Sequence, residues 1–308
     1  MLETVTTNSA ATEQDSQPVD APVVPAAAPS RNQALRSLWR RPLFDAAVLI
    51  VVVMLLMALV PRLFTRIDPQ SCTLSRSRDG MSAGHPMGFD IQGCDYFSNV
   101  VHGARTSMEV GVLTAALIFA VALITGSLAG YFGGFVDATI SRVADIMLGM
   151  PVMIASLVVL YQFQNRTIWT IVFVLVLFGW AGTMRYMRGS VIQTSANEYV
   201  QAAKVLGVPN LTILRRHVLP NSVMPLIVIS TLGIGAGMTA EAGFAILGVG
   251  LKLPAYSWGL QIASASQDGN WQLAPHLMFF PAAMLGLCTL AFVVIGETLR
   301  EVLDVRGR

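Results

Sequence analysis

The sequence predicts an all-α polytopic membrane protein with six transmembrane helices. Of its 308 residues, 54% are hydrophobic and only 12% are charged, a balance that indicates a membrane protein rather than soluble domains. Six apolar runs are each close to the roughly 20 residues that cross a bilayer as a helix. None of them alternates apolar and polar residues, so strands are not expected. The runs are residues 43–64, 108–131, 140–163, 168–184, 223–247 and 277–295.

Proline and glycine add detail to these runs. Pro151 lies within the third run and predicts a kink, because its ring removes one backbone hydrogen bond. Gly126 and Gly130 in the second run stand one helical turn apart, as do Gly233 and Gly237 in the fifth. This spacing predicts close helix packing, either inside one subunit or across a subunit interface.

The distribution of charge predicts that both termini face the cytoplasm. Residues 1–30 contain acids and prolines but no base, and we expect a disordered cytoplasmic tail rather than a signal peptide. Residues 31–64 carry arginines into the first transmembrane helix, as the positive-inside rule expects. Residues 65–107 would then form an extracytoplasmic loop, and 108–308 a core with five further helices.

The sequence lacks the residue patterns that ATP hydrolysis and metal binding require. Neither of the two lysines, Lys204 and Lys252, follows a glycine, so ATP hydrolysis by a phosphate-binding Gly-Lys-Ser/Thr loop is excluded. The four histidines offer no metal-ligand pair on one helical face. We expect no enzyme activity, no catalytic residue, no metal site, no cofactor bound by this chain and no nucleic-acid partner.

Residues 198–221 are the one long charged interruption in the hydrophobic second half of the chain. They begin with good helix formers, and Gly207 stands where a left-handed cap would end that helix. Pro209 favours a turn, and residues 211–218 are predicted to form a second short helix that ends before Pro220. Two short helices around a glycine turn predict a docking surface on the cytoplasmic side.

This loop resembles the EAA loop of ABC importer permeases, the segment that fits into a groove on the ATPase subunit. The matching positions are Ala202, Ala203, Gly207, Leu219 and Pro220. Gln201 replaces the usual glutamate, and His217 replaces an isoleucine, which is typical of the oligopeptide/dipeptide/nickel branch. The ATPase-coupling residues that the resemblance implies are Glu198, Gln201, Ala202, Ala203, Gly207, Arg215 and Pro220.

Other stretches extend the resemblance from about residue 34 to residue 306. Residues 85–90 read His-Pro-Met-Gly-Phe-Asp and resemble the outer loop of the C-type peptide permease, although Cys94 replaces its usual arginine. Residues 247–250 resemble the family's Leu-Gly-x-Gly stretch. Residues 296–304 resemble its C-terminal segment.

The resemblance implies a type I ABC importer permease fold in the bacterial cytoplasmic membrane. Its partners would be a homologous permease subunit, two ATPase subunits that bind ATP and Mg²⁺, an extracytoplasmic substrate-binding protein and the lipid bilayer. The importer would carry di- or oligopeptides through an alternating-access pore, with nickel, glutathione or opines as alternative substrates. Alternatives of another class are a secondary transporter, which leaves the loop motif unexplained, and a non-transporting scaffold, which has no need of an internal acid.

Glu241 is the ionisable residue deepest in an otherwise apolar run. A charge at that depth costs several kcal/mol, on the order of 3 on insertion scales, so the side chain should face protein or water. It also matches the glutamate that precedes the family's Leu-Gly-x-Gly stretch. Two roles stay open for it, a place on the substrate pathway and a structural hydrogen bond to the neighbouring subunit.

Cys72 and Cys94 are predicted to form a disulfide. With the orientation above, both lie in the outer loop on the oxidising side of the membrane, whereas Cys288 lies within the sixth run. Closing this polar loop would remove roughly 3 kcal/mol of unfolded-chain entropy and hold the segment as a platform for the binding protein. The alternative is two unpaired thiols.

Overall fold

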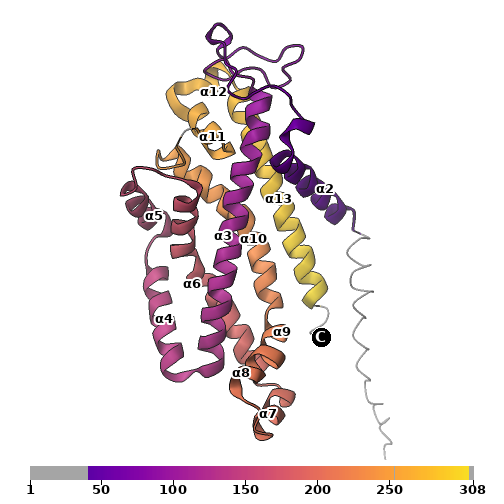
Figure 1. Ribbon diagram of the computed structural model, residues 1–308, viewed down its shortest axis with the longest axis vertical. Coiled ribbons are helices and arrows are strands. Elements are labelled where there is room, and N and C mark those ends of the chain that lie inside the picture. Colours follow the sequence, from indigo (N-terminus) through magenta and orange to yellow (C-terminus); the bar gives the residue numbers. More distant parts are fainter. Residues whose placement is uncertain (1–40, 253, 305–308) are drawn as a thin grey trace, which may run out of the picture.

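The computed structural model describes residues 41–252 and 254–304, and this part of the chain is built from helices (Figure 1). Only isolated β-bridges, all between residues of the outer loop, occur beside them in the described ranges. The predicted tail 1–30, the arginines at 31–40 and the last residues, 305–308, lie outside the described residues. The all-helical prediction is therefore confirmed for what the structure describes.

Five helices in the described ranges are long and apolar enough to cross a membrane. They are α2 (Pro42–Leu59), α3 (Tyr96–Phe132), α6 (Ile168–Ser195), α10 (Met224–Ile246) and α13 (His276–Asp304). They correspond to five of the six predicted runs. A bent pair, α4 (Gly134–Gly149) and α5 (Val152–Tyr161), occupies the remaining run and brings the number of spans to six if it is counted as one.

Pro151 breaks the third run more sharply than the predicted kink. The axes of α4 and α5 meet at 86°, so the run expected as one bent helix over 140–163 is two helices. A proline disfavours the helical region for the residue before it, and Met150 accordingly has φ −92° and ψ 135°, which is extended backbone. Helix α4 therefore ends at Gly149, and α5 starts a new direction.

Two of the spanning helices extend well beyond their apolar runs. Helix α3 begins at Tyr96, twelve residues before the predicted run at 108, and Asp95 caps it by accepting a hydrogen bond from the Ser98 N–H at 2.8 Å. Helix α6 continues to Ser195, beyond the predicted end at 184. Hydropathy marks the part of a helix that matches the lipid, whereas hydrogen bonding and capping decide where the helix stops.

The glycines of the second run pack against a neighbouring helix of the same chain. A Cβ on Gly126 would stand 2.8 Å from the Met184 carbonyl oxygen of α6, and one on Gly130 would stand 2.8 Å from the Arg188 carbonyl oxygen. A Cβ on Gly237 of α10 would stand 3.4 Å from the Gly111 Cα of α3, an ordinary contact distance. The structure therefore places these glycines at helix contacts inside the subunit.

The bundle has two distinct ends (Figure 1). One end carries the segment of residues 60–95 together with α11 (Trp258–Ser266) and α12 (Asn270–Leu273). The other end carries α7 (Glu198–Val205), α8 (Asn210–Ile213), a π-helix (Leu214–Val218) and α9 (Leu219–Ser222). The remaining short elements are the 3₁₀-helices Pro61–Leu63, Leu74–Arg76 and Gln267–Gly269. Arg41 pairs with Glu301, which places the start of α2 beside the last turns of α13.

Candidate functional site

The loop 198–221 projects from the bundle between α6 and α10 (Figure 1). Its first helix, α7, ends at Val205, and Gly207, just beyond the C-cap residue Leu206, has a φ of +77°. The Val208 N–H donates to the Ala203 carbonyl at 3.2 Å, and the Gly207 N–H donates to the Lys204 carbonyl at 3.0 Å. These two bonds define a Schellman cap, so the predicted helix and its left-handed glycine are confirmed.

The second half of the loop differs from the prediction at Pro220. The expected helix over 211–218 was predicted to end before this proline, but helical backbone runs from Asn210 to Ser222 through a π-turn over Leu214–Val218. Pro220 follows directly after the π-turn, and its missing N–H removes one hydrogen bond from this continuous helical stretch. The π-turn widens the helix directly before the proline ring.

The inward face of the loop is held firmly to the bundle. Five of its apolar side chains are buried in a cluster with side chains of α3, α4, α6 and α10; they are Val200, Ala203, Ile213, Leu214 and Val218. The Gln201 side-chain amide donates to the Ser195 carbonyl at the end of α6, at 2.7 Å. The Lys204 ammonium lies 5.5 Å from the centre of the Tyr131 ring of α3. Movement of the loop must therefore move these helices with it.

The outward tip of the loop is apolar and bare. Val205 is 89% exposed and Leu206 is 81% exposed, and Tyr199 and Leu211 of the same loop are exposed as well. Exposed apolar side chains that gather in one place mark an interaction surface. We call these four residues, Tyr199, Val205, Leu206 and Leu211, the apolar tip.

Ion pairs join the two helices behind the loop. Arg188 of α6 donates two hydrogen bonds to the Asp137 carboxylate of α4, at 2.5 and 2.6 Å. Arg185 of α6 pairs with Asp145 of α4 at 2.5 Å. A bidentate arginine–carboxylate pair fixes orientation as well as distance. Helices α4 and α6 and the loop thus form one connected block.

Glu241 lies inside its own subunit rather than on a surface. Its side chain is fully buried, and its Oε1 accepts a hydrogen bond from the Ser257 hydroxyl at 2.8 Å. Ser257 in turn caps α11 by accepting from the Leu260 N–H at 3.0 Å. Gly259 approaches so closely that a Cβ there would stand 2.5 Å from Glu241 Oε2. In this conformation the carboxyl group is enclosed by its own chain, and its place on the substrate pathway or at a subunit contact stays a prediction.

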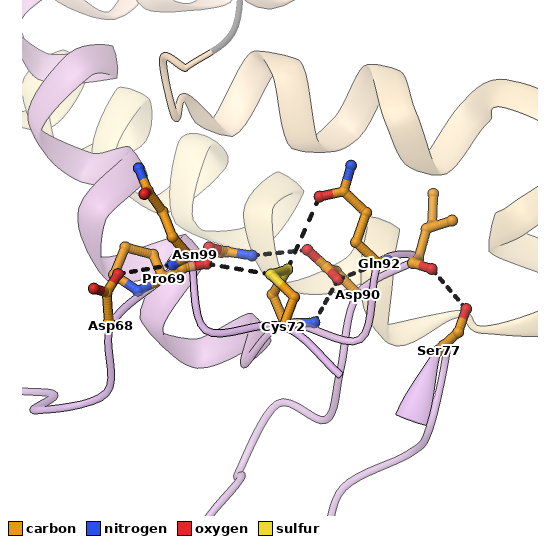
Figure 2. The surroundings of a disulfide bond; sticks show 10 residues. Asp68, Pro69, Cys72, Ser77, Asp90, Gln92 and Asn99 are labelled. Atoms are coloured by element: carbon orange, nitrogen blue, oxygen red, sulfur yellow. Dashed lines mark hydrogen bonds between the residues drawn. A yellow bond between two sulfur atoms is a disulfide. The ribbon is translucent and has the colours of Figure 1, made fainter. Parts of the chain in front are cut away.

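The outer loop is closed by a disulfide between Cys72 and Cys94, the pair predicted from the sequence (Figure 2). Asp90 organises the backbone beside it, because its Oδ1 accepts from the N–H groups of Gln92 and Cys94, both at 2.8 Å. Its Oδ2 accepts from the Asn99 side-chain amide of α3 at 2.9 Å. Figure 2 shows these bonds tying the loop to the start of α3.

Further contacts dock the outer loop onto neighbouring elements. His85 pairs with the buried Asp95 at 2.6 Å, and Arg78 donates to the Asn270 side-chain oxygen of α12 at 2.6 Å. His276 of α13 lies 3.1 Å from the Phe89 carbonyl oxygen. Within the described residues, no group of three His, Cys, Asp or Glu side chains is arranged to hold a metal ion.

The chain is similar in sequence to known membrane transport proteins. Residues 122–308 match the family described as the inner membrane component of binding-protein-dependent transport systems. The chain is 34% identical to the dipeptide transport system permease protein DppC of Alkalihalophilus pseudofirmus, over 89% of each chain. The chain belongs to this family. The match confirms, together with the helices described above, the predicted permease fold and membrane location.

Other relatives of this permease carry related names. It is 32% identical to the oligopeptide transport system permease protein OppC of Bacillus subtilis, over 85% of each chain. It is 29% identical to the glutathione transport system permease protein GsiD of Pectobacterium atrosepticum, over 87% of this chain and 90% of the other. A solved amino acid ABC transporter aligns with 68% of this permease and 92% of its own chain, at a TM-score of 0.46 and 14% identity.

The structure distributes the predicted coupling residues of the permease over both faces of the loop. Six of them are exposed: Glu198, Gln201, Ala202, Gly207, Arg215 and Pro220. Ala203 is buried, and its methyl group packs into the cluster beneath the loop. Sequence reasoning missed Val205 and Leu206, because an apolar residue at the end of a short helix is expected to face inward, and only the tertiary fold shows otherwise.

Proposed function

We propose that this permease is one transmembrane subunit of an ATP-driven importer for di- or oligopeptides. The apolar tip carries the proposal, since it is a bare surface on a loop that is firmly joined to the spanning helices. The dipeptide and oligopeptide permeases among its relatives support peptides as the substrate. The 29% identity to a glutathione permease supports glutathione as the second candidate.

The proposed assembly includes ATPase subunits because the sequence has no phosphate-binding Gly-Lys-Ser/Thr loop and the loop 198–221 exposes the apolar tip. A homologous permease subunit completes the pore, two ATPase subunits bind ATP and Mg²⁺ and receive the loop 198–221, and a substrate-binding protein delivers the substrate from outside. Both termini and the loop face the cytoplasm, which the positive-inside rule supports. Glu198, Gln201, Ala202, Gly207, Arg215 and Pro220 meet the ATPase, with Ala203 packed beneath them.

The connected block of α4, α6 and the loop suggests how the motion is transmitted. Closure of the two ATPases moves the loop, and the loop cannot move without α6 because its apolar side chains are buried against that helix. The bidentate Arg188–Asp137 pair then carries α4 along. Coupling needs the tip to bind the open and closed ATPase pair with different affinity.

Co-purification tests the proposal. A tagged permease, isolated in mild detergent from the cells that make it, should bring two P-loop ATPases with it. Leu206→Asp places a charge on the apolar tip and should reduce their recovery about tenfold, as expected for a residue at the centre of an interface. The matched control is Leu74→Asp, because Leu74 is 78% exposed in the outer loop and its replacement should leave recovery unchanged. A wild-type permease that purifies alone and still transports would refute the proposal.

A further inference from the structure

A pocket of about 400 Å³ lies at the end of the bundle opposite the loop 198–221. Its walls are formed by the disulfide-closed outer loop, the start of α3, residues 248–251 and 255–257, and α11. Its polar lining includes Asp90, Gln92, Asn99, Tyr256, Gln261 and Gln267. Leucine, isoleucine and alanine side chains line the rest, so the pocket has the mixed character of a small-molecule site.

Two amide side chains of the lining carry buried oxygen acceptors that have no partner among the described residues. The Asn99 NH₂ group is committed to Asp90 Oδ2 at 2.9 Å, and the Gln261 NH₂ group to the Asn99 carbonyl at 2.7 Å. These bonds fix which end of each amide is oxygen. Asn99 Oδ1 and Gln261 Oε1 are buried and accept no hydrogen bond from the described residues. Unsatisfied buried oxygens are costly unless a donor or a positive charge compensates for them.

Asp90 makes the same region negative. No described Lys, Arg or His side chain lies within ion-pair distance of its carboxylate, and its three accepted bonds leave room for one more on Oδ2. Burial raises the pKa of Asp90, a sign that its charged form is under-compensated. Burial and the charges of Asp68 and Asp90 also raise the pKa of Tyr256 across the pocket.

The cation among the described lining residues is Arg166, and its guanidinium is already engaged. Its Nε donates to the Gly250 carbonyl at 3.1 Å, and one terminal nitrogen donates to the Gly248 carbonyl at 3.3 Å. It therefore holds the segment after α10 rather than neutralising Asp90. The acceptors of the pocket lining therefore favour a small, positively charged hydrogen-bond donor as the ligand.

We propose that this pocket binds a primary ammonium group, and, resting on the proposed function, that it receives the N-terminal ammonium of a peptide. An ammonium carries three donors, which matches Asp90 Oδ2 and the two amide oxygens once the wall opens slightly to admit it. A divalent metal ion would need more carboxylate ligands than this single one. The apolar part of the lining accommodates the peptide's side chains. The site lies where a substrate delivered from outside would first meet the permease.

Calorimetry on the full-length permease in lipid nanodiscs, without ATP or any partner, tests the proposal. L-alanyl-L-alanine should bind, and N-acetyl-L-alanyl-L-alanine, which lacks the ammonium, should bind at least about tenfold more weakly. Asp90→Asn should cause a similar loss for the free dipeptide. The matched control is Asp79→Asn, because Asp79 is an exposed acid on the same loop outside the pocket lining and its replacement changes net charge equally.

A second variant keeps the test decisive if Asp90→Asn disturbs the loop. Ser264 of α11 lines the pocket and takes part in none of the Asp90 bonds, so Ser264→Trp should fill the pocket and abolish dipeptide binding while the Cys72–Cys94 disulfide is retained. Equal binding of the acetylated dipeptide, or undiminished binding to Ser264→Trp, would overturn the proposal.

Butylamine separates the two sources of an ammonium group. If the dipeptide binds much more tightly than butylammonium, the pocket reads the peptide itself. If the two bind equally, the pocket recognises only the ammonium group, and its ligand would be a lysine side chain of the docked binding protein. Loss of ammonium binding in a permease that still recruits ATPases would refute this inference alone, whereas binding without ATPase recruitment would refute the proposed function.

Discussion

At the scale of single residues, Glu241 is a carboxylate whose surroundings all come from its own chain. Its depth in an apolar run predicted that it must face protein or water, and it faces Ser257 and Gly259 of α11. The carboxyl group lies at the N-terminal end of that helix, where the helix dipole favours an acidic side chain. It therefore joins α10 to α11 at the outer side of the bundle.

We expect Gly259→Ala to destabilise the permease by about 1–3 kcal/mol, as inserting a methyl group into a filled site does. The new Cβ would stand 2.5 Å from Glu241 Oε2 and 2.7 Å from the Ala242 Cα, so backbone would have to shift. Thermal unfolding of the purified chain measures the effect.

Glu241→Gln should lower the free energy of unfolding by about 1 kcal/mol, because it places an NH₂ donor near the positive end of α11. The same thermal unfolding measurement checks this value.

Gly286→Ala is the matched control for Gly259→Ala. Gly286 lies in a helix, α13, and no heavy atom stands within 4 Å of where its Cβ would be. Alanine there should leave the unfolding temperature unchanged or raise it. Equal unfolding temperatures for the two alanine variants would mean that the close approach of α11 to Glu241 does not hold the fold together.

At the scale of elements, the cap of α7 decides where the apolar tip stands. The chain reverses at Gly207 in a left-handed conformation, and open space surrounds the position that a Cβ would take. A substitution at Gly207 therefore has two effects. It strains the backbone, and it places a new side chain where a partner protein would bind. Both effects are separate from any packing inside the permease.

Gly207→Leu should uncouple transport while the permease still inserts and assembles. A leucine in this conformation costs about 1–2 kcal/mol, and its side chain would project from the loop against the ATPase. Stimulation of ATPase activity by the loaded binding protein should fall. Gly207→Asn is the control, since asparagine tolerates the left-handed region and should retain most of the stimulation. Normal stimulation in Gly207→Leu would remove the loop from the coupling path.

The sequence predicted the elements better than their bends and partners. Apolar runs located each long helix that the structure describes, because lipid demands length and hydrophobicity. They could not show that Pro151 turns the chain by 86°, since a proline in a run allows anything from a kink to a new helix. The Cys72–Cys94 pair followed from its compartment, but the Arg78–Asn270 and His276–Phe89 contacts that dock the same loop did not, because their partners lie 192 and 187 residues apart in the sequence.

At the scale of the whole molecule, two chemically different ends lie on opposite sides of the apolar bundle (Figure 1). One end holds a disulfide, an arrangement suited to an oxidising compartment. The other holds the arginine pairs of α6 and the exposed arginines of the loop 198–221. Both observations favour the same orientation, with the disulfide outside, although they depend on unrelated chemistry.

Labelling of single cysteines with a membrane-impermeant maleimide tests this orientation. Leu273→Cys lies on α12 beside the outer loop and Leu206→Cys lies at the apolar tip, and both parent side chains are at least 70% exposed. In intact cells, or spheroplasts where an outer membrane blocks the reagent, Leu273→Cys should react and Leu206→Cys should not. Inside-out vesicles should reverse the result. The native thiols serve as the internal control, since Cys72 and Cys94 are bonded and Cys288 is buried. Labelling of Leu206→Cys from outside would show that the orientation is opposite to the proposed one. The apolar tip could then not bind an ATPase in the cytoplasm.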